Sequence, residues 1–210
     1  MSISRIATYT NTGVSSTLTV TISAAPNAGD ILIAAFEFAN SVTHNSGPSG
    51  WSPITASGTG GQMWAYYKVA DGSETAASIV NSGASTTGGL VIAYRGADVP
   101  VGATPLGQST SSNTITAPTI SSVPAGAYSI SIGGSRAGSA ISSTTSGTNW
   151  TERIDTASQS CITLADNPTS TGSVTGATFT FTASTSARNA ISFYLPVFVA
   201  NTGTPLLMAM

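Results

Sequence analysis

Polar and apolar residues alternate along much of this chain with a period of two. Residues 17–23 place Leu18, Val20 and Ile22 on one side and hydroxyl side chains on the other, and residues 177–182 repeat the pattern with two phenylalanines. A period of two is typical of strands that bury one face, and threonine on the other face combines high β-propensity with hydration. The pattern predicts half-buried antiparallel strands.

One stretch departs from this alternation because it is apolar throughout. Residues 31–36 predict a central strand covered on both faces, or a strand whose outer face meets a partner. Nowhere do apolar residues recur at helical spacing over three turns, so we expect an all-β protein, an antiparallel β-sandwich with little or no helix. Turn signals separate the expected strands: Asn45-Ser46-Gly47-Pro48, Asp71-Gly72, Asn81-Ser82-Gly83, Pro124-Ala125-Gly126 and Asn167-Pro168.

The second half of the chain repeats landmarks of the first half in the same order. Residues 29–95 are echoed weakly by residues 126–195, and a drift in the spacing fits loop insertions. Self-similarity of this kind predicts a pseudo-duplicated structural unit. The matching landmarks are Gly29 and Gly126, Trp51 and Trp150, Asp71 and Asp166, and Tyr94 and Tyr194, separated by 97, 99, 95 and 100 positions.

The length and composition favour one domain over two. The chain has 210 residues, of which 40% are hydrophobic, and a half of about 70 residues without a disulfide or metal would be marginally stable. We expect a single β-sandwich over residues 1–199, with half-repeats at about 14–97 and 114–196 that share one core. Residues 97–113, rich in proline and glycine, are expected to cross between the halves, and residues 200–210 form an apolar C-terminal tail.

The tail is a candidate interaction segment because an unattached tail is usually polar. Here five apolar residues follow Pro205, and exposed apolar side chains favour association. We expect the segment to dock on a neighbouring molecule in preference to its own domain. The candidate interface residues in it are Leu206, Leu207, Met208 and Met210.

Charged residues are scarce and this excludes some partners. They make up 7% of the chain, the net charge is -2 and the six basic residues are dispersed, whereas soluble domains carry about 25% charged residues. Nucleic acid is not expected as a partner because phosphate binding needs clustered cations, and no apolar run reaches the length of a membrane span. A surface without charges suits burial in a permanent interface; the alternative is a secreted domain with a hydroxyl-rich surface.

No catalytic constellation accompanies these features. His44 is the only histidine and is expected in a surface loop, and Cys161 is the only cysteine and is expected as a structural strand residue. The nearest approach to a calcium loop is residues 71–74, which a hairpin turn explains better. We expect no catalytic residues, cofactor or metal site, although distant carboxylates could still converge as a glycosidase pair.

The aromatic residues supply the other candidate interaction site. If alternation puts Met63 and Tyr67 in the core, Trp64 and Tyr66 face the opposite side. This pair could stack on a sugar ring, anchor a subunit interface or lie beneath a loop. The duplicated tryptophans, Trp51 and Trp150, are expected to plug the core at the sheet edge.

The landmark segments, taken in order, resemble a jelly-roll-like β-sandwich domain of tailed-phage virion proteins. They are Ala28-Gly29-Asp30-Ile31-Leu32, Ser49-Gly50-Trp51, Tyr67-Lys68-Val69-Ala70 and Ala93-Tyr94-Arg95-Gly96, and the likeness extends over most of residues 14–196.

The resemblance implies a non-enzymatic virion structural protein, either a head decoration (cement) protein or a tail-associated one. Because the chain has no long fibrous region, decoration is favoured. The implied partners are the major capsid protein and further copies of the chain, in a trimer or another symmetric oligomer. The implied location is the capsid surface, after synthesis in the host cytoplasm without a signal peptide. The alternative is a carbohydrate-binding or host-adsorption domain of a tail or fibre protein, with a glycan bound at Trp64 and Tyr66.

Overall fold

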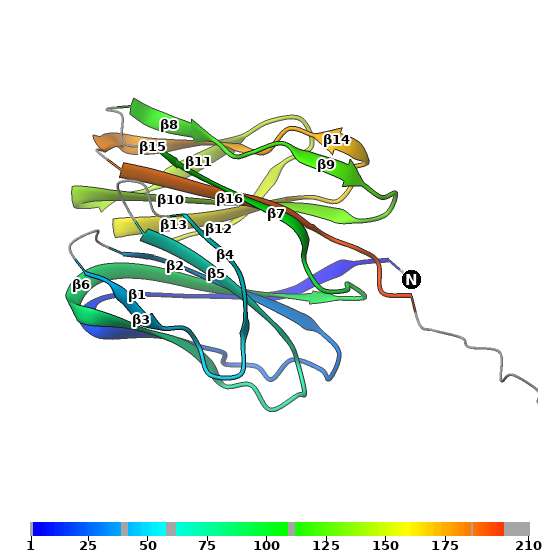
Figure 1. Cartoon of the computed structure of the whole chain (residues 1–210), viewed down its shortest axis with the longest axis horizontal. Coiled ribbons are helices and arrows are strands. Elements are labelled where there is room, and N and C mark those ends of the chain that lie inside the picture. The colour runs from blue at the N-terminus through cyan, green and yellow to red at the C-terminus, as the bar shows by residue number, and fades with distance from the viewer. Residues whose placement is uncertain (1, 39–41, 58–61, 109–111, 186, 200–210) are drawn as a thin grey trace, which may run out of the picture.

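The computed structural model describes residues 2–38, 42–57, 62–108, 112–185 and 187–199, and in these ranges every element is a strand (Figure 1). The first half forms a sheet in the order β1 (Ser4–Thr21), β6 (Ala76–Arg95), β2 (Ile31–Phe38), β5 (Gln62–Val69) and β4 (Ser52–Ser57), with β3 (His44–Ser46) paired to β6. The second half forms a sheet in the order β12 (Thr151–Asp155), β13 (Ser158–Asn167), β10 (Tyr128–Ile141), β16 (Ala187–Leu195) and β7 (Val101–Gln108).

Two smaller sheets cover the second half. One has the order β11 (Ser143–Ser146), β15 (Thr178–Thr185) and β8 (Ser112–Thr116), and the other pairs β14 (Gly172–Val174) with β9 (Ile120–Val123). Neighbouring strands pair antiparallel in all four sheets. The prediction of an all-β, antiparallel β-sandwich is therefore confirmed.

The apolar run at residues 31–36 forms the centre of the first sheet. All eight residues of β2 are buried, which confirms the prediction of a strand covered on both faces. Ile31, Ile33 and Ala35 belong to a core that also contains Ile130 and Leu164 of the second half. The two large sheets thus pack face to face and share one core, as the marginal size of either half required.

The opposite face of β2 is covered by the first half itself. Leu32 and Phe36 pack in a second core with Leu18 of β1 and Ile79 of β6, so these two long strands bend back over their own sheet. The bend coincides with a register shift, where residues 80–85 of β6 face only three residues of β1. The turn signal at residues 81–83 marks this irregularity and does not end the strand.

The second half has a similar outer layer. Phe179 and Phe181 of β15, with Ile115 of β8, pack on Cys161 and Ala190 of the second large sheet. The molecule is therefore built of four layers, with the two large sheets at the centre (Figure 1).

The strand orders of the two large sheets match. Read in chain order, β1, β2, β4, β5 and β6 correspond to β7, β10, β12, β13 and β16, and each set is arranged in the same sequence across its sheet. Gly29 and Gly126 have similar positive φ angles of 87° and 83°, and the N–H groups of Trp51 and Trp150 each donate to the carbonyl oxygen three residues earlier. A duplicated unit would produce this correspondence; the duplication and the jelly-roll connectivity themselves stay predictions.

The segment expected to cross between the halves contributes a strand of its own. Within residues 97–113, β7 pairs with β16 and places Pro105 opposite Ile191. β7 lies at the edge of its sheet, where the N–H that proline lacks is not needed for a second neighbour. The crossover is thus part of the second sheet.

The close approach of the halves can be tested at Gly88, which faces the second large sheet. A Cβ added to Gly88 would lie 2.0 Å from the backbone oxygen of Ser160, so Gly88→Ala forces the sheets apart. We expect Gly88→Ala to lower the free energy of unfolding by about 1–3 kcal/mol in urea titrations. Gly83→Ala is the matched control, because its nearest neighbour would be Val42 at an ordinary 3.7 Å. Equal stability of the two variants would contradict the packing described.

Candidate functional site

Trp64 and Tyr66 of β5 face away from the shared core, as alternation predicted, but they do not form an exposed platform. Tyr66 is only 4% exposed and belongs to the second core, and Trp64 is half-buried against that core. The Tyr66 hydroxyl lies 2.7 Å from Nε2 of His44, and the ring centroids of His44 and Trp64 are 4.2 Å apart. Of the three alternatives, the pair therefore matches the last, burial beneath another segment.

That covering segment is β3, which places His44 differently from the expectation of a surface loop. His44 begins a short strand, pairs with Asn81 of β6 and is half-buried. Burial lowers the pKa of His44 below its usual range, while hydrogen bonding at the Val80 backbone acts in the opposite direction. The only histidine thus holds β3 over the aromatic pair.

A buried carboxyl group, which the sequence did not single out, lies between the halves. Both side-chain oxygens of Glu37 in β2 accept from Nδ2 of Asn189 in β16, at 3.0 and 3.2 Å. Burial raises the pKa of Glu37 to about 8, against the opposing effects of Asn189 and the charge of Arg136. Glu37 is therefore largely protonated at neutral pH. The signal for it in the sequence was the position of Glu37, an acidic residue directly after the apolar run at residues 31–36.

A second polar contact joins the halves at the other end of the shared core. The Tyr94 hydroxyl of β6 donates to Oδ2 of Asp166 in β13 at 3.1 Å, and Arg153 donates to Oδ1 at 2.7 Å. Burial raises the pKa of Asp166, and Arg153 and Tyr94 lower it in part. Asp166 is fully buried, unlike its landmark partner Asp71, whose side chain is 62% exposed.

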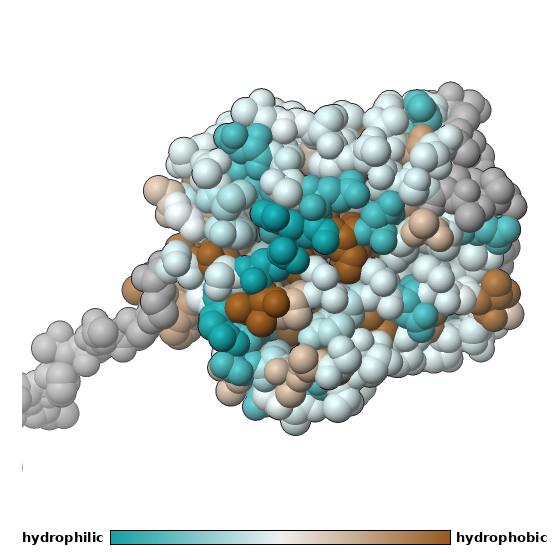
Figure 2. All heavy atoms as spheres, turned by 180° about the vertical axis from the view of Figure 1, so that it is seen from behind, coloured by the Kyte–Doolittle hydropathy of each residue, from teal (hydrophilic) through white to brown (hydrophobic). Residues whose placement is uncertain are grey.

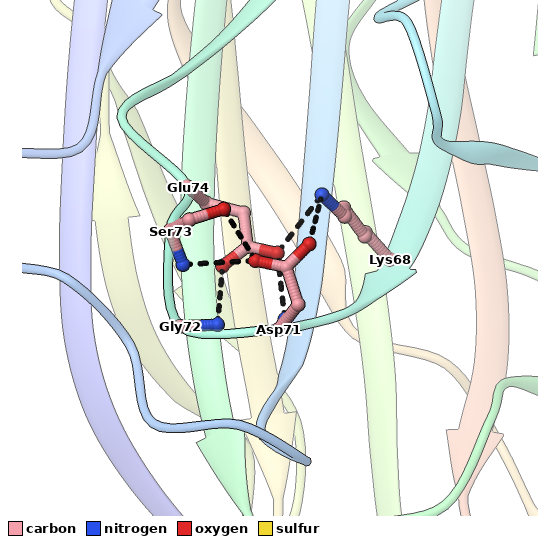
Figure 3. Close-up of polar contacts among 5 residues, drawn as sticks. All are labelled: Lys68, Asp71, Gly72, Ser73 and Glu74. Atoms are coloured by element: carbon pink, nitrogen blue, oxygen red, sulfur yellow. Dashed lines mark hydrogen bonds and ion pairs between the residues drawn. The ribbon is translucent and has the colours of Figure 1, made fainter.

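The turn after β5 gathers the only lysine and two carboxylates (Figure 3). Nζ of Lys68 lies 2.9 Å from Oε1 of Glu74 and 3.5 Å from Oδ2 of Asp71. The Glu74 carboxylate also accepts from the N–H groups of Asp71 and Gly72, and Asp71 accepts from Ser73. These bonds stabilise a turn, and they account for the two closely spaced acidic residues at 71 and 74 without a bound calcium ion. The turn is not a hairpin, however, because β2 lies between β5 and β6.

Cys161 is placed as the sequence predicted, inside β13 and fully buried. Burial, together with the hydrogen bond to Asp155, raises the pKa of the thiol well above its usual range. In the described ranges, no three His, Cys, Asp or Glu side chains are grouped in a way that could hold a metal ion. That part of the chain also contains no helix long and apolar enough to cross a membrane.

Most of the large exposed apolar residues lie at the end of the molecule where the described chain begins and ends (Figure 1). Six large apolar side chains are exposed in the described part of the chain. Strand register puts Ile6, Val69 and Val101 at this end and Val14 at the opposite end, and the N–H of Phe198 donates to the carbonyl oxygen of Gly96, just after β6, with Val199 next in the chain. We call the five the terminal face. They are Ile6, Val69, Val101, Phe198 and Val199.

A hollow of about 470 Å³ opens in the terminal face between Val69 and Phe198. Its wall includes Asp30 and Arg95, whose side chains form a two-point ion pair with both N–O distances at 2.9 Å. Seen from behind, apolar side chains are visible at this end, and further ones lie near the centre of the view and at the opposite end of a mostly pale surface (Figure 2). This arrangement can receive an apolar group beside a fixed, neutralised ion pair.

The remaining candidates of the sequence are the tail residues and the duplicated tryptophans. Leu206, Leu207, Met208 and Met210 lie outside the described residues. Trp51 and Trp150 are both half-buried and pack against core clusters, which agrees with their expected place at the edge of the core. Trp150 also lines a second hollow, of about 460 Å³.

Glu37 makes the free energy of unfolding of the chain depend on pH. Because the carboxyl binds its proton more tightly in the folded chain (pKa about 8) than at its ordinary value of 4.5, the free energy of unfolding falls as the pH rises from about 5 to 8. The slope reaches at most about 1.4 kcal/mol per pH unit. We expect Glu37→Gln to remove this contribution, so that the free energy of unfolding falls less with rising pH in urea titrations across this range.

Glu74→Gln is the control for this experiment. The pKa of Glu74 is lowered, because the N–H of Asp71 and the ammonium of Lys68 outweigh the effect of burial. Glu74 is therefore ionised in both states above pH 5, and its replacement should leave the slope unchanged. A Glu37→Gln variant that keeps the slope of the parent would assign the effect to another group.

No protein-family model matches this sequence, and no curated protein or solved structure matches it. The resemblance to tailed-phage virion domains therefore depends on the sequence landmarks alone.

Proposed function

We propose that this protein is a non-enzymatic assembly protein that docks through its terminal face. In the light of the resemblance, it acts as a capsid decoration protein that binds and stabilises an assembled phage shell. The observation that carries the proposal is that five of the six exposed large apolar side chains, in the described part of the chain, lie at one end, where two of them flank a hollow. Scattered apolar residues need no explanation, but a cluster of them marks an interaction surface.

The composition of the surface supports a permanent contact. Interface cores are depleted in charge and enriched in apolar and aromatic residues, and the terminal face contains Phe198 and three exposed valines. The one ion pair at the hollow, Asp30 with Arg95, is already satisfied within the chain. Covering this pair therefore does not separate its two charges, which would be the main cost of burying ions in a dry contact. Asp98, which also lines the hollow, accepts a hydrogen bond from the N–H of Val99.

Stabilisation of a shell follows from mass action. A protein that binds the assembled lattice and not its dissociated subunits stabilises the lattice by an amount that grows with the logarithm of its free concentration relative to its dissociation constant. A standard interface buries about 800 Å² on each partner, and repetition over a shell multiplies the effect. A trimer or another symmetric oligomer would present several terminal faces to the same shell.

An enzymatic role finds little support in the ionisable groups. Glu37 and Asp166 have the raised pKa values that mark many catalytic acids. Both are fully buried between the sheets and bonded to residues that hold the halves together. Neither group is exposed to solvent in the structure.

Replacing Val69 and Val199 by lysine tests the terminal face. These side chains are 49% and 79% exposed, so the double variant should fold normally, yet it places two charges in the proposed contact. We expect at least about a tenfold loss of affinity for undecorated shells of the capsid protein encoded with this chain, measured by co-sedimentation. The parent should also raise the temperature at which those shells dissociate.

Val14→Lys is the matched control, since Val14 is 72% exposed at the opposite end. It should bind shells as the parent does. The proposal fails if the parent neither binds shells nor stabilises them, or if the double lysine variant binds as tightly as Val14→Lys. Analytical ultracentrifugation of the same samples reports whether self-association depends on the same face.

A further inference from the structure

We propose that the hollow beside Trp150 is a binding site for a neutral glycan. It lies in the second half of the chain and shares no lining residue with the hollow of the terminal face. Its volume of about 460 Å³ falls within the range of small-ligand sites, roughly 300–1,000 Å³. The proposal concerns a ligand, and it does not depend on the capsid-binding function.

Trp150 forms the aromatic part of the wall, and a hydrogen bond and core packing hold its ring in place. Nε1 of Trp150 donates to the carbonyl oxygen of Thr175 at 3.1 Å, and the ring packs against two core clusters. The backbone N–H of Trp150 closes a turn on Gly147, and Asn149 within that turn has a positive φ of 64°. The part of the indole that lines the hollow is therefore already fixed, so a contact with it costs little conformational entropy when a ligand binds.

The rest of the wall carries hydroxyl and amide groups. Thr148, Asn149, Thr169, Thr171 and Ser173 are exposed around the hollow, and none of its thirteen lining residues is charged. These side chains both donate and accept hydrogen bonds, as sugar hydroxyls do.

One buried amide fixes the two segments that carry these groups. Oδ1 of Asn167 accepts from the N–H and the hydroxyl of Thr169, at 3.1 and 3.2 Å, and Nδ2 donates to the carbonyl oxygen of Thr148 at 3.4 Å. Asn167 is 4% exposed. It ties the turn before Trp150 to the loop after β13, so the polar wall is largely formed before a ligand arrives.

The chemistry of the wall selects the class of ligand. A phosphate, sulfate or carboxylate would need a cation, and the lining has none. A purely apolar ligand would leave the surrounding hydroxyl and amide groups without partners. A neutral sugar presents an apolar ring face for the indole and hydroxyl groups for the remaining wall.

This site replaces the one that the sequence suggested for a glycan. Tyr66 is buried, and the half-buried Trp64 has the ring of His44 in β3 against it, with the ring centroids 4.2 Å apart. Trp150 combines a half-buried indole with a hollow. The signal in the sequence was the density of Thr, Ser and Asn at residues 167–175, next in space to one of the three tryptophans.

The test is binding of the purified full-length chain to an array of neutral and acidic glycans, followed by titration calorimetry with the best ligand. Two variants address the hollow. Ser173→Arg fills it from an exposed position, and Asn149→Gly removes the amide while keeping a residue that tolerates positive φ. We expect Ser173→Arg to weaken binding at least about tenfold and Asn149→Gly about threefold or more.

Ser49→Arg is the matched control, because Ser49 is an exposed residue of the corresponding turn before Trp51. It should bind the glycan as the parent does, and thermal unfolding should show all three variants folded. The proposal is overturned if no neutral glycan binds, if only acidic glycans bind, or if Ser173→Arg binds like Ser49→Arg. The lysine variant of Val69 and Val199 should retain glycan binding, which separates failure here from failure of shell binding.

Discussion

The structure depends on the face-to-face packing of two large sheets. Their inner faces form a single apolar core, which neither half could bury alone. Buried polar contacts close this core at its two ends, from Glu37 to Asn189 at one and from Tyr94 to Asp166 at the other. Such contacts are costly when half-satisfied, so they disfavour shifted arrangements of the two sheets. The close approach at Gly88 adds a steric limit to the same register.

This packing decides which residues are left for recognition. Glu37 and Asp166, whose pKa values are raised, are buried between the sheets, and the only histidine and two aromatic residues hold β3 in place. The ends of the strands remain open. The terminal face combines Val69 of the first half with Val101 of the second, so it exists only because the halves are joined. The Trp150 hollow, by contrast, is lined only by residues of the second half.

The alternation of apolar and polar residues predicted correctly which side of a strand each side chain occupies, but it predicted less well how exposed those side chains are to solvent. It placed Trp64 and Tyr66 on the side opposite the shared core, which the structure bears out. It gave no sign that β1 and β6 would bend back over that side, because the bend arises from a register shift between strands distant in sequence. Glu37 was overlooked for a related reason: a carboxyl can follow an apolar run in a buried strand only if a partner such as Asn189, 152 positions away, meets it.

The sequence by itself determined the strands, the fully buried β2, the lack of helix in the described ranges and the need for a shared core, because these follow from the period and amount of apolar residues. It also fixed a surface with few charges. Only the tertiary structure decided which polar groups are buried, which apolar ones gather at one end, and where a hollow forms beside a tryptophan. Those features depend on contacts between segments far apart in the chain, and residue periodicity carries no information about such contacts.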